Sequence, residues 1–230
     1  MCTVTVLRRQ HAMTITMNRD EKTTRVAEQP PQLWPHRDLT APRDGPSGGT
    51  WIGMNARGDW ACVLNSYDAH TPLKQHTSRG GIIPALLMHP DTAAVLATMD
   101  LTCFPPFRIM HGDAHHWKLL HWNGRVLLPE AKSESTSCDY FISSSSWNTH
   151  SVVAARNQAF ARWQKKGCAY DDDGIPIIHR WQEKGAEATA VLMRRAESLT
   201  TSLTQIMFRD GATAVMRYWP ADRLVPTDCI

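Results

Sequence analysis

The sequence predicts an α+β fold in which helices cover antiparallel sheets. Most strand patterns come as consecutive pairs joined by short turns, which is typical of β-hairpins. Helical patterns are inserted between these pairs, whereas a doubly wound parallel sheet would need strands and helices in strict alternation. The chain has 230 residues, of which 42% are hydrophobic and 20% are charged. This size and composition indicate one globular domain over residues 1–230.

The first hairpin begins at the start of the chain. Thr3–Leu7 carries β-branched and apolar residues in near alternation, Arg8–His11 is a polar turn, and Met13–Met17 alternates as the returning strand. Residues 18–49 then lack a regular pattern because prolines interrupt it repeatedly. We therefore expect a long loop there.

The other predicted elements rest on the same kinds of signal. Asn123–Gly124 is a strong signal for a tight hairpin turn, and Asp91 is a suitable N-cap for the helix that follows it. The remaining predicted strands span residues 50–53, 60–64, 107–110, 117–122, 125–128, 140–143, 199–208 and 213–219. The predicted helices span residues 79–89, 91–99 and 149–163, with a further partly helical stretch in 176–195.

Charge and hydropathy exclude several classes of protein. The formal net charge is only +3, which gives no electrostatic basis for binding nucleic acid. The longest apolar stretches fall far short of the ~20 residues that a membrane-spanning helix needs. The first residues also lack the arrangement of a secretory signal. We therefore expect a cytoplasmic protein without a membrane span.

Six cysteines are scattered along the chain without a C-x-x-C pair, and in a cytoplasmic protein we expect them to be reduced. They are Cys2, Cys62, Cys103, Cys138, Cys168 and Cys229. Cys2 differs from the others because its small side chain permits removal of Met1, which would leave a thiol and a free α-amine on one residue. An α-amine has an unperturbed pKa of about 7.7–8.0, so it can act as a general base for the thiol at neutral pH.

Two further segments carry polar groups that could complete such a site. The N-R-D-E sequence at residues 18–21 follows the second strand, and the hairpin returns it to the neighbourhood of the first residues. Asp20 could hold the α-amine, and Arg19 could stabilise a thiolate. Asn65 ends a strand that follows a glycine-rich hairpin, and its amide could donate to an oxyanion. Taken alone, each segment is also typical of an ordinary polar turn.

Together, three segments carry a resemblance to a known family. M-C-T-V-T at the start, N-R-D-E at residues 18–21 and G-G-T-W-I-G-M-N-A-R-G at residues 48–58 look like the NRDE family, which includes the transport-and-Golgi-organisation proteins of eukaryotes. The resemblance implies a four-layer αββα sandwich of antiparallel sheets, of the N-terminal-nucleophile hydrolase class. The layout is also similar to that of bile-salt hydrolases and penicillin V acylases, in which a terminal cysteine attacks an amide.

The resemblance also implies roles for individual residues. Cys2 would be both nucleophile and base, Asp20 would anchor its amine, and Asn65 would donate to the oxyanion. The acylase group places its arginine three residues before the aspartate, whereas Arg19 is adjacent to Asp20 in this chain.

Two later positions of the acylase pattern match this chain more loosely. The second oxyanion residue would be Asn148, with Ser144 as the alternative. The late arginine would be Arg156, on the helix that follows.

Three functional hypotheses follow. The first is a hydrolase of a small-molecule amide or related acyl bond, which needs no cofactor. The second is a non-enzymatic haem or acyl-lipid binding and trafficking protein on the same fold. The third is an interaction protein with a vestigial site. A histidine-rich stretch could bind a metal or a haem in the second case, although it is also typical of a solvated turn. Its residues are His111, Asp113, His115, His116 and His121.

Overall fold

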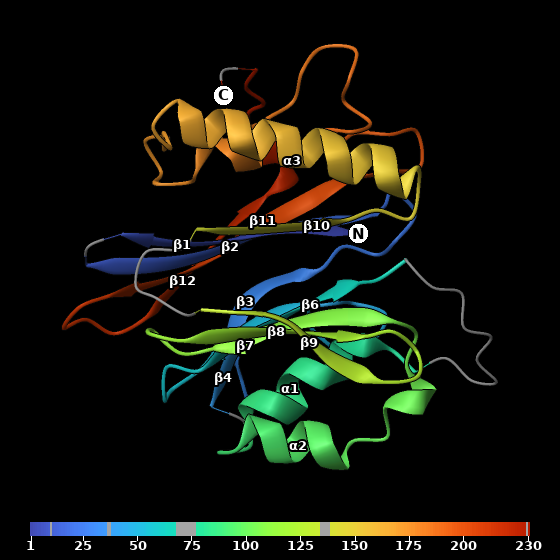
Figure 1. Cartoon of the computed structure of the whole chain (residues 1–230), viewed down its shortest axis with the longest axis vertical. Helices are drawn as coiled ribbons and strands as arrows, with labels where there is room; N and C mark the ends of the chain where they lie inside the picture. Colours follow the sequence, from blue (N-terminus) through green and yellow to red (C-terminus); the bar gives the residue numbers. More distant parts are fainter. Residues whose placement is uncertain (10, 36–37, 68–76, 134–138, 229) are drawn as a thin grey trace. The chain divides into compact units, whose positions relative to one another are not determined.

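The structure is a computed structural model that describes residues 1–9, 11–35, 38–67, 77–133, 139–228 and 230 (Figure 1). The chain divides into two compact units. The first unit comprises Met1–Arg25, Asp139–Met207 and Arg217–Ile230. The second unit comprises Val26–Cys138 and Phe208–Met216. Among the described residues, no helix is long and apolar enough to cross a membrane.

A five-stranded antiparallel sheet has the strand order β10-β1-β2-β11-β12. Its strands are β1 (Cys2–Arg9), β2 (Ala12–Lys22), β10 (Tyr140–Ser144), β11 (Ser198–Arg209) and β12 (Val215–Pro220). The predicted first hairpin is therefore confirmed. The start of the chain lies inside the sheet, because β1 pairs with β2 on one side and with β10 on the other.

One long helix, α3 (Thr149–Lys165), lies along this sheet (Figure 1). Its buried side chains recur at the three- and four-residue spacing that places them on one face of a helix. They are Val152, Arg156, Ala159, Phe160 and Trp163. Phe160 stacks on Phe141 of β10 with ring centroids 4.6 Å apart. Arg156 is the one charged member of this buried row, which already marks it as unusual.

The second unit contains a seven-stranded antiparallel sheet with the strand order β3-β4-β5-β6-β7-β8-β9. Its strands are β3 (Gln29–Trp34), β4 (Leu39–Arg43), β5 (Ile52–Asn55), β6 (Trp60–Asn65), β7 (Phe107–Gly112), β8 (Trp117–Trp122) and β9 (Leu127–Lys132). Two short helices, α1 (Ile82–Leu87) and α2 (Thr92–Thr98), pack with it (Figure 1). Asp91 is the N-cap of α2 as predicted, since its carboxylate accepts from the Ala94 backbone N–H at 3.0 Å.

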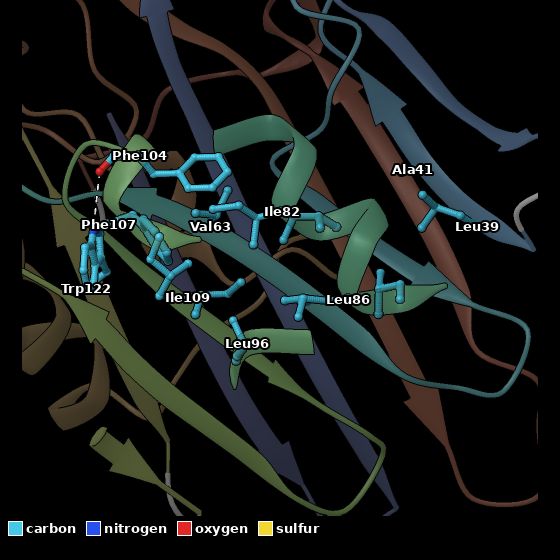
Figure 2. Packing of buried hydrophobic residues seen from close by; sticks show 14 of the residues in the cluster. Leu39, Ala41, Val63, Ile82, Leu86, Leu96, Phe104, Phe107, Ile109 and Trp122 are labelled. Atoms are coloured by element: carbon cyan, nitrogen blue, oxygen red, sulfur yellow. Dashed lines mark hydrogen bonds between the residues drawn. The ribbon is translucent and has the colours of Figure 1, made fainter. Parts of the chain in front are cut away.

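The second unit contains a large cluster of buried apolar side chains (Figure 2). Leu86 of α1 is fully buried in it, as is Ile109 of β7. The indole nitrogen of Trp122 donates to the Phe104 carbonyl at 3.2 Å, which satisfies the polar atom that this large ring brings into the core.

Glycine is required where two backbone segments of the second unit meet. A Cβ atom on Gly49 would lie 2.5 Å from the carbonyl carbon of Gly80. The Thr50 N–H donates to the Gly80 carbonyl at 3.0 Å, so the two segments are joined as well as close. The glycine-rich segment at 48–58 is thus explained locally by packing.

The proline-rich segment departs from the prediction. Gln29–Trp34 and Leu39–Arg43 are not loop but pair as the antiparallel strands β3 and β4, with Gln32 opposite Ala41 and Trp34 opposite Leu39. β3 is an edge strand of the seven-stranded sheet. Proline is tolerated at such an edge because one side of the strand needs no ladder hydrogen bond.

The other differences are smaller. The stretch 176–195 is mostly irregular, and only Ile177–Arg180 forms a short 3-10 helix. β9 begins at Leu127, two residues later than predicted. The α+β class with antiparallel sheets is confirmed, and the division into one domain over the whole chain stays a prediction.

Candidate active site

Cys2 opens β1 and is flanked on both sides within the sheet. Ser144 of β10 lies opposite Cys2 on one side, and Arg19 of β2 lies opposite it on the other. Side chains of directly opposed residues project to the same face of an antiparallel sheet, so these three share one face. The backbone nitrogen of Cys2 donates to Ser144 Oγ at 3.2 Å. A thiol, a hydroxyl and a guanidinium therefore gather at the first residue of the strand.

The Cys2 thiol is protonated at neutral pH in the chain that carries Met1. Burial raises its pKa most strongly, and the negative charge of Asp20 raises it further. The positive charges of the Met1 ammonium and of Arg19 lower the pKa, but the balance stays upward. An activated thiolate therefore needs a base placed next to it.

Asp20 lies on the opposite face from Arg19, because neighbouring residues of a strand alternate. Its carboxylate accepts from Arg156 Nη2 at 3.2 Å and from the Thr200 hydroxyl at 2.7 Å. Its main-chain carbonyl accepts from the Met1 ammonium at 3.1 Å, and its N–H donates to the Met1 carbonyl at 2.9 Å. The backbone of Asp20, rather than its carboxylate, thus holds the first residue.

Arg156 of α3 contacts several buried polar groups beneath the helix. Its side chain and that of Asp20 are both 0% exposed, so the two charges form a buried pair. Arg156 Nη1 also donates to Thr3 Oγ1 and to Ser143 Oγ, each at 2.9 Å, and its Nε donates to the Thr189 carbonyl at 3.3 Å. A buried guanidinium is tolerated only when its donors are satisfied in this way.

Asn18, the first residue of the N-R-D-E motif, makes hydrogen bonds that connect buried segments of the first unit. Its amide nitrogen donates to the His179 and Val191 carbonyls at 3.0 and 3.4 Å, and its oxygen accepts from His179 Nδ1. His179 Nε2 is thereby left as an acceptor for the Thr5 hydroxyl, at 2.7 Å. Burial lowers the pKa of His179 to about 3. This neutral imidazole ties β1 and β2 to the irregular stretch that follows α3.

A cation that the motif analysis did not single out lies beside the first residue. Arg195 Nη1 donates to the Met1 sulfur at 3.2 Å, and its Nη2 donates to Ser145 Oγ at 3.3 Å. The guanidinium lies 4.8 Å from the ring centre of Trp147. Ser146 Oγ also contacts the Met1 sulfur, at 3.3 Å. The side chain of Met1 therefore sits among polar donors.

Arg19 and Ser144 lie directly opposite Cys2 in the sheet. Arg19 Nη1 donates to Thr201 Oγ1 at 3.3 Å and its Nη2 donates to Glu21 Oε2 at 3.4 Å, so its guanidinium is shared with the next strand and the motif's own glutamate. Asn148 is exposed, has a left-handed backbone with φ of 43°, and makes no capping hydrogen bond at the start of α3. Between the two candidates for the second oxyanion residue, Ser144 is the one in contact with Cys2.

Asn65 belongs to the second unit, where it ends β6 opposite Phe107. Its amide nitrogen donates to the Tyr67 hydroxyl at 2.9 Å. Its role as an oxyanion donor stays a prediction.

The histidine-rich stretch does not converge on one point. His111 is partly buried on β7, and burial lowers its pKa, with a further contribution from Lys118. His121 Nε2 lies 3.0 Å from Ser66 Oγ. The backbone N–H groups of His115 and His116 donate to the Asp113 carboxylate at 2.6 and 2.7 Å, which is an ordinary Asx-type turn. In the part of the chain that the structure describes, no three His, Cys, Asp or Glu side chains are grouped to hold a metal.

Three of the other cysteines lie among the described residues. Cys62 is buried, and Cys103 and Cys168 are partly buried. Cys138 and Cys229 lie outside the described residues.

Sequence reasoning missed the partners that complete the site, namely Ser143, Thr200, His179 and Arg195. None of them carries a local motif signal. Thr200 is 180 positions from Asp20 and His179 is 161 positions from Asn18, so only the folded sheet brings them together. A buried arginine in the apolar row of a predicted helix was the one available hint.

Comparison of the coordinates with solved structures supports the fold. A Caenorhabditis elegans ortholog of N-acylethanolamine-hydrolyzing acid amidase superposes with a TM-score of 0.51 at 12% identity, over 89% of this chain and 92% of that chain. Two variants of a conjugated bile acid hydrolase from Clostridium perfringens give TM-scores of 0.46 and 0.48, each at 10% identity, and cover 95% and 100% of this chain and 92% and 100% of theirs. At such identities the likeness to the amidase shows a shared fold of the N-terminal-nucleophile hydrolase type and no more.

The sequence comparisons give the family. No curated protein matches this chain. The family model described as Transport and Golgi organisation 2 matches residues 1–208, and it includes every segment from which the NRDE resemblance was drawn. The chain is therefore a member of the Transport and Golgi organisation 2 family, built on an N-terminal-nucleophile hydrolase-like fold.

Proposed function

We propose that this protein is an N-terminal-nucleophile hydrolase that cleaves an amide or related acyl bond of a small molecule through Cys2. The observation that carries the proposal is the position of Cys2 at the first residue of a central strand. Ser144 and Arg19 lie opposite it, and the backbone of Asp20 holds the residue before it. This arrangement suits a residue that would supply its own base after removal of Met1.

The proposed reaction begins with the α-amine of Cys2 taking the thiol proton. The thiolate attacks the substrate carbonyl carbon, and the carbonyl oxygen becomes an oxyanion. The C–N bond then breaks as the α-ammonium returns its proton to the leaving amine, which leaves a thioester on Cys2. Water, deprotonated by the same α-amine, attacks the thioester and releases the carboxylic acid with the free thiol. Each step balances without a cofactor.

The neighbouring residues have supporting roles in this proposal. Arg19 favours the thiolate by its charge, since it already lowers the pKa of Cys2. Ser144 holds the Cys2 nitrogen and is preferred to the exposed Asn148 as the second oxyanion donor, with Asn65 as the first. Asp20 and Arg156 act as positioning residues that keep β1, β2 and α3 in register.

An acyl-enzyme measurement tests the proposal. The wild-type chain, with loss of Met1 verified by mass, would be incubated with octanoyl-p-nitroanilide and quenched in acid. We expect an octanoyl group on the peptide that begins with Cys2, together with release of p-nitroaniline. Cys2→Ala should abolish both, with a loss of at least about 1,000-fold in rate, while Cys103→Ala should leave them unchanged. Turnover that survives in Cys2→Ala, or acylation at another cysteine, would refute the mechanism.

A second proposal, binding and trafficking of a haem or acyl-lipid ligand without catalysis, draws on a separate feature. The second unit contains a cavity of about 370 Å³ whose lining includes the apolar side chains of Trp34, Pro84 and Met88 together with glycines and hydroxyl side chains such as Ser47. Haemin titration tests this proposal. A Soret shift that Met88→Ala abolishes would support it, and an unshifted spectrum would contradict haem binding.

A further inference from the structure

Arg195 is held in place on three sides within the first unit. Its Nε donates to the Ala188 carbonyl at 2.9 Å, its Nη2 donates to Ser145 Oγ, and the Trp147 ring faces the guanidinium. Ser145 Oγ in turn lies 2.6 Å from the Trp147 carbonyl, so the hydroxyl proton is committed there and its oxygen accepts from Arg195. Such a fixed guanidinium is pre-organised to recognise an acceptor.

The group that Arg195 meets on its remaining side is a poor match. Nη1 and the Ser146 hydroxyl converge on the Met1 sulfur, at 3.2 and 3.3 Å. A thioether is a weak hydrogen-bond acceptor, whereas a guanidinium and a hydroxyl are strong donors. Two strong donors aimed at one weak acceptor indicate a position suited to a stronger acceptor than Met1 provides.

The charge of Arg195 also lacks a close counter-ion. Among the residues that the structure describes, no carboxylate forms a salt bridge with Arg195, and the nearby Asp20 carboxylate accepts from Arg156 and Thr200. Burial lowers the pKa of Arg195 most strongly and the like charge of Arg156 lowers it further, while the negative charge of Asp20 raises it. A partly buried cation in this position gains from an anion that enters beside it.

We propose that Arg195 and Ser146 form a carboxylate subsite at the position of the Met1 sulfur, next to the backbone nitrogen of Cys2, and that the Met1 side chain covers this subsite until Met1 is removed. A carboxylate offers two strongly accepting oxygens to the two donors that now meet the sulfur. The inference rests on the proposed function and names its substrate class, an amide or acyl compound that carries a carboxylate near the bond to be cleaved. Loss of Met1 would then free the Cys2 amine and open the subsite in one event.

Binding to a catalytically dead chain tests the proposal without relying on turnover. Cys2→Ala still permits removal of Met1, which mass spectrometry would verify. The probes are N-octanoylglycine and its uncharged counterpart N-octanoylglycinamide, with both dissociation constants measured by calorimetry. We expect the acid to bind at least about tenfold more tightly than the amide, as one charge-assisted hydrogen bond supplies.

Matched variants test whether Arg195 and Ser146 cause the tighter binding of the acid. Arg195→Gln in the Cys2→Ala background should remove it, Arg195→Lys should keep part of it, and Ser146→Ala should weaken it. Arg194→Gln removes an exposed neighbouring charge from the same segment and should leave the preference intact. The same Cys2→Ala chain, expressed with methionine aminopeptidase inhibited so that Met1 is retained, should bind both probes equally.

Equal affinity for the two probes, no detectable binding of the acid, or a preference that survives Arg195→Gln would each overturn the subsite. The outcomes separate the two proposals. A carboxylate preference in Cys2→Ala together with no acyl-enzyme in the wild type would retain the subsite and reject the hydrolase.

Discussion

The interiors of the two units differ in what accompanies their apolar side chains. The largest buried cluster of the second unit is assembled from apolar side chains, most of them on β4, β6, β7, β8 and the helices α1 and α2. The first unit also has an apolar cluster, which includes Phe160 and Trp163 of α3, but beside it lies a connected polar network that includes a buried ion pair and a buried neutral histidine. Buried polar groups cost free energy unless every partner is supplied.

The difference indicates which part of the interior tolerates substitution and which does not. An apolar core tolerates exchange of one hydrophobic side chain for another of similar volume. The network under α3 does not, because each member satisfies a particular donor or acceptor on another element. The N-R-D-E motif lies on β2, where neighbouring side chains point to opposite faces of the sheet. Asn18 and Asp20 face the polar network, while Arg19 and Glu21 lie on the same face as Cys2. Departures from an all-apolar interior are expected at functional sites.

Breaking the buried ion pair should have the largest effect. Asp20→Ala leaves the Arg156 charge buried without its partner and should lower the free energy of unfolding by about 3–5 kcal/mol, measured by urea denaturation. The control is Arg162→Ala, on the same helix as Arg156. It removes an exposed salt bridge to Glu183 and should cost less than about 1 kcal/mol. In the double variant Asp20→Ala with Arg156→Met, the loss should be smaller than the sum of the losses in Asp20→Ala and Arg156→Met alone. Strict additivity would show that the two charges are not coupled.

A substitution that creates a cavity in the apolar cluster of the second unit should destabilise the chain without changing the polar network of the first unit. Leu86 is 0% exposed, so Leu86→Ala should cost about 2–5 kcal/mol through lost burial and the remaining cavity. Leu86→Met keeps the volume and should cost less than about 1.5 kcal/mol. At a temperature where both variants are folded, the alkylation rate of Cys2 should equal that of the wild type. A changed rate would contradict the separation of the two interiors.

The buried histidine should make stability depend on pH. The pKa of His179 is lowered from 6.5 to about 3 in the folded chain, so between these values the unfolded chain binds the extra proton. The stability contributed by the neutral ring is complete above pH 6.5. Between pH 6.5 and about 3 it decreases as the pH decreases, by about 1.4 kcal/mol per pH unit.

Comparison of urea midpoints at pH 6.5 and 5.0 measures this slope. His179→Gln should flatten it at the cost of stability at neutral pH. His150→Gln, which changes an exposed histidine of α3, is the matched control and should keep the wild-type slope. A slope unchanged by His179→Gln would show that other groups dominate.

The sequence predicted what is local in this fold. The β1–β2 hairpin, the α2 N-cap at Asp91 and the helix α3 all follow from alternation, capping and periodicity within short windows. The β3–β4 hairpin was missed because proline was taken as a breaker, although an edge strand accepts it. The partners of the motif were missed for a different reason. Arg195 and His179 carry no signal of their own, and only the order of strands in the sheet brings them to Met1 and Asn18.

The most direct test of the account is the state and reactivity of the first cysteine. The chain would be purified without an N-terminal tag, alkylated briefly with iodoacetamide near neutral pH, and digested for mass analysis of its N-terminal peptide. We expect Met1 to be absent and Cys2 to be labelled well ahead of Cys62, Cys103 and Cys168, because the amine of Cys2 deprotonates its thiol. Retention of Met1, or labelling of Cys2 no faster than the other cysteines, would contradict it.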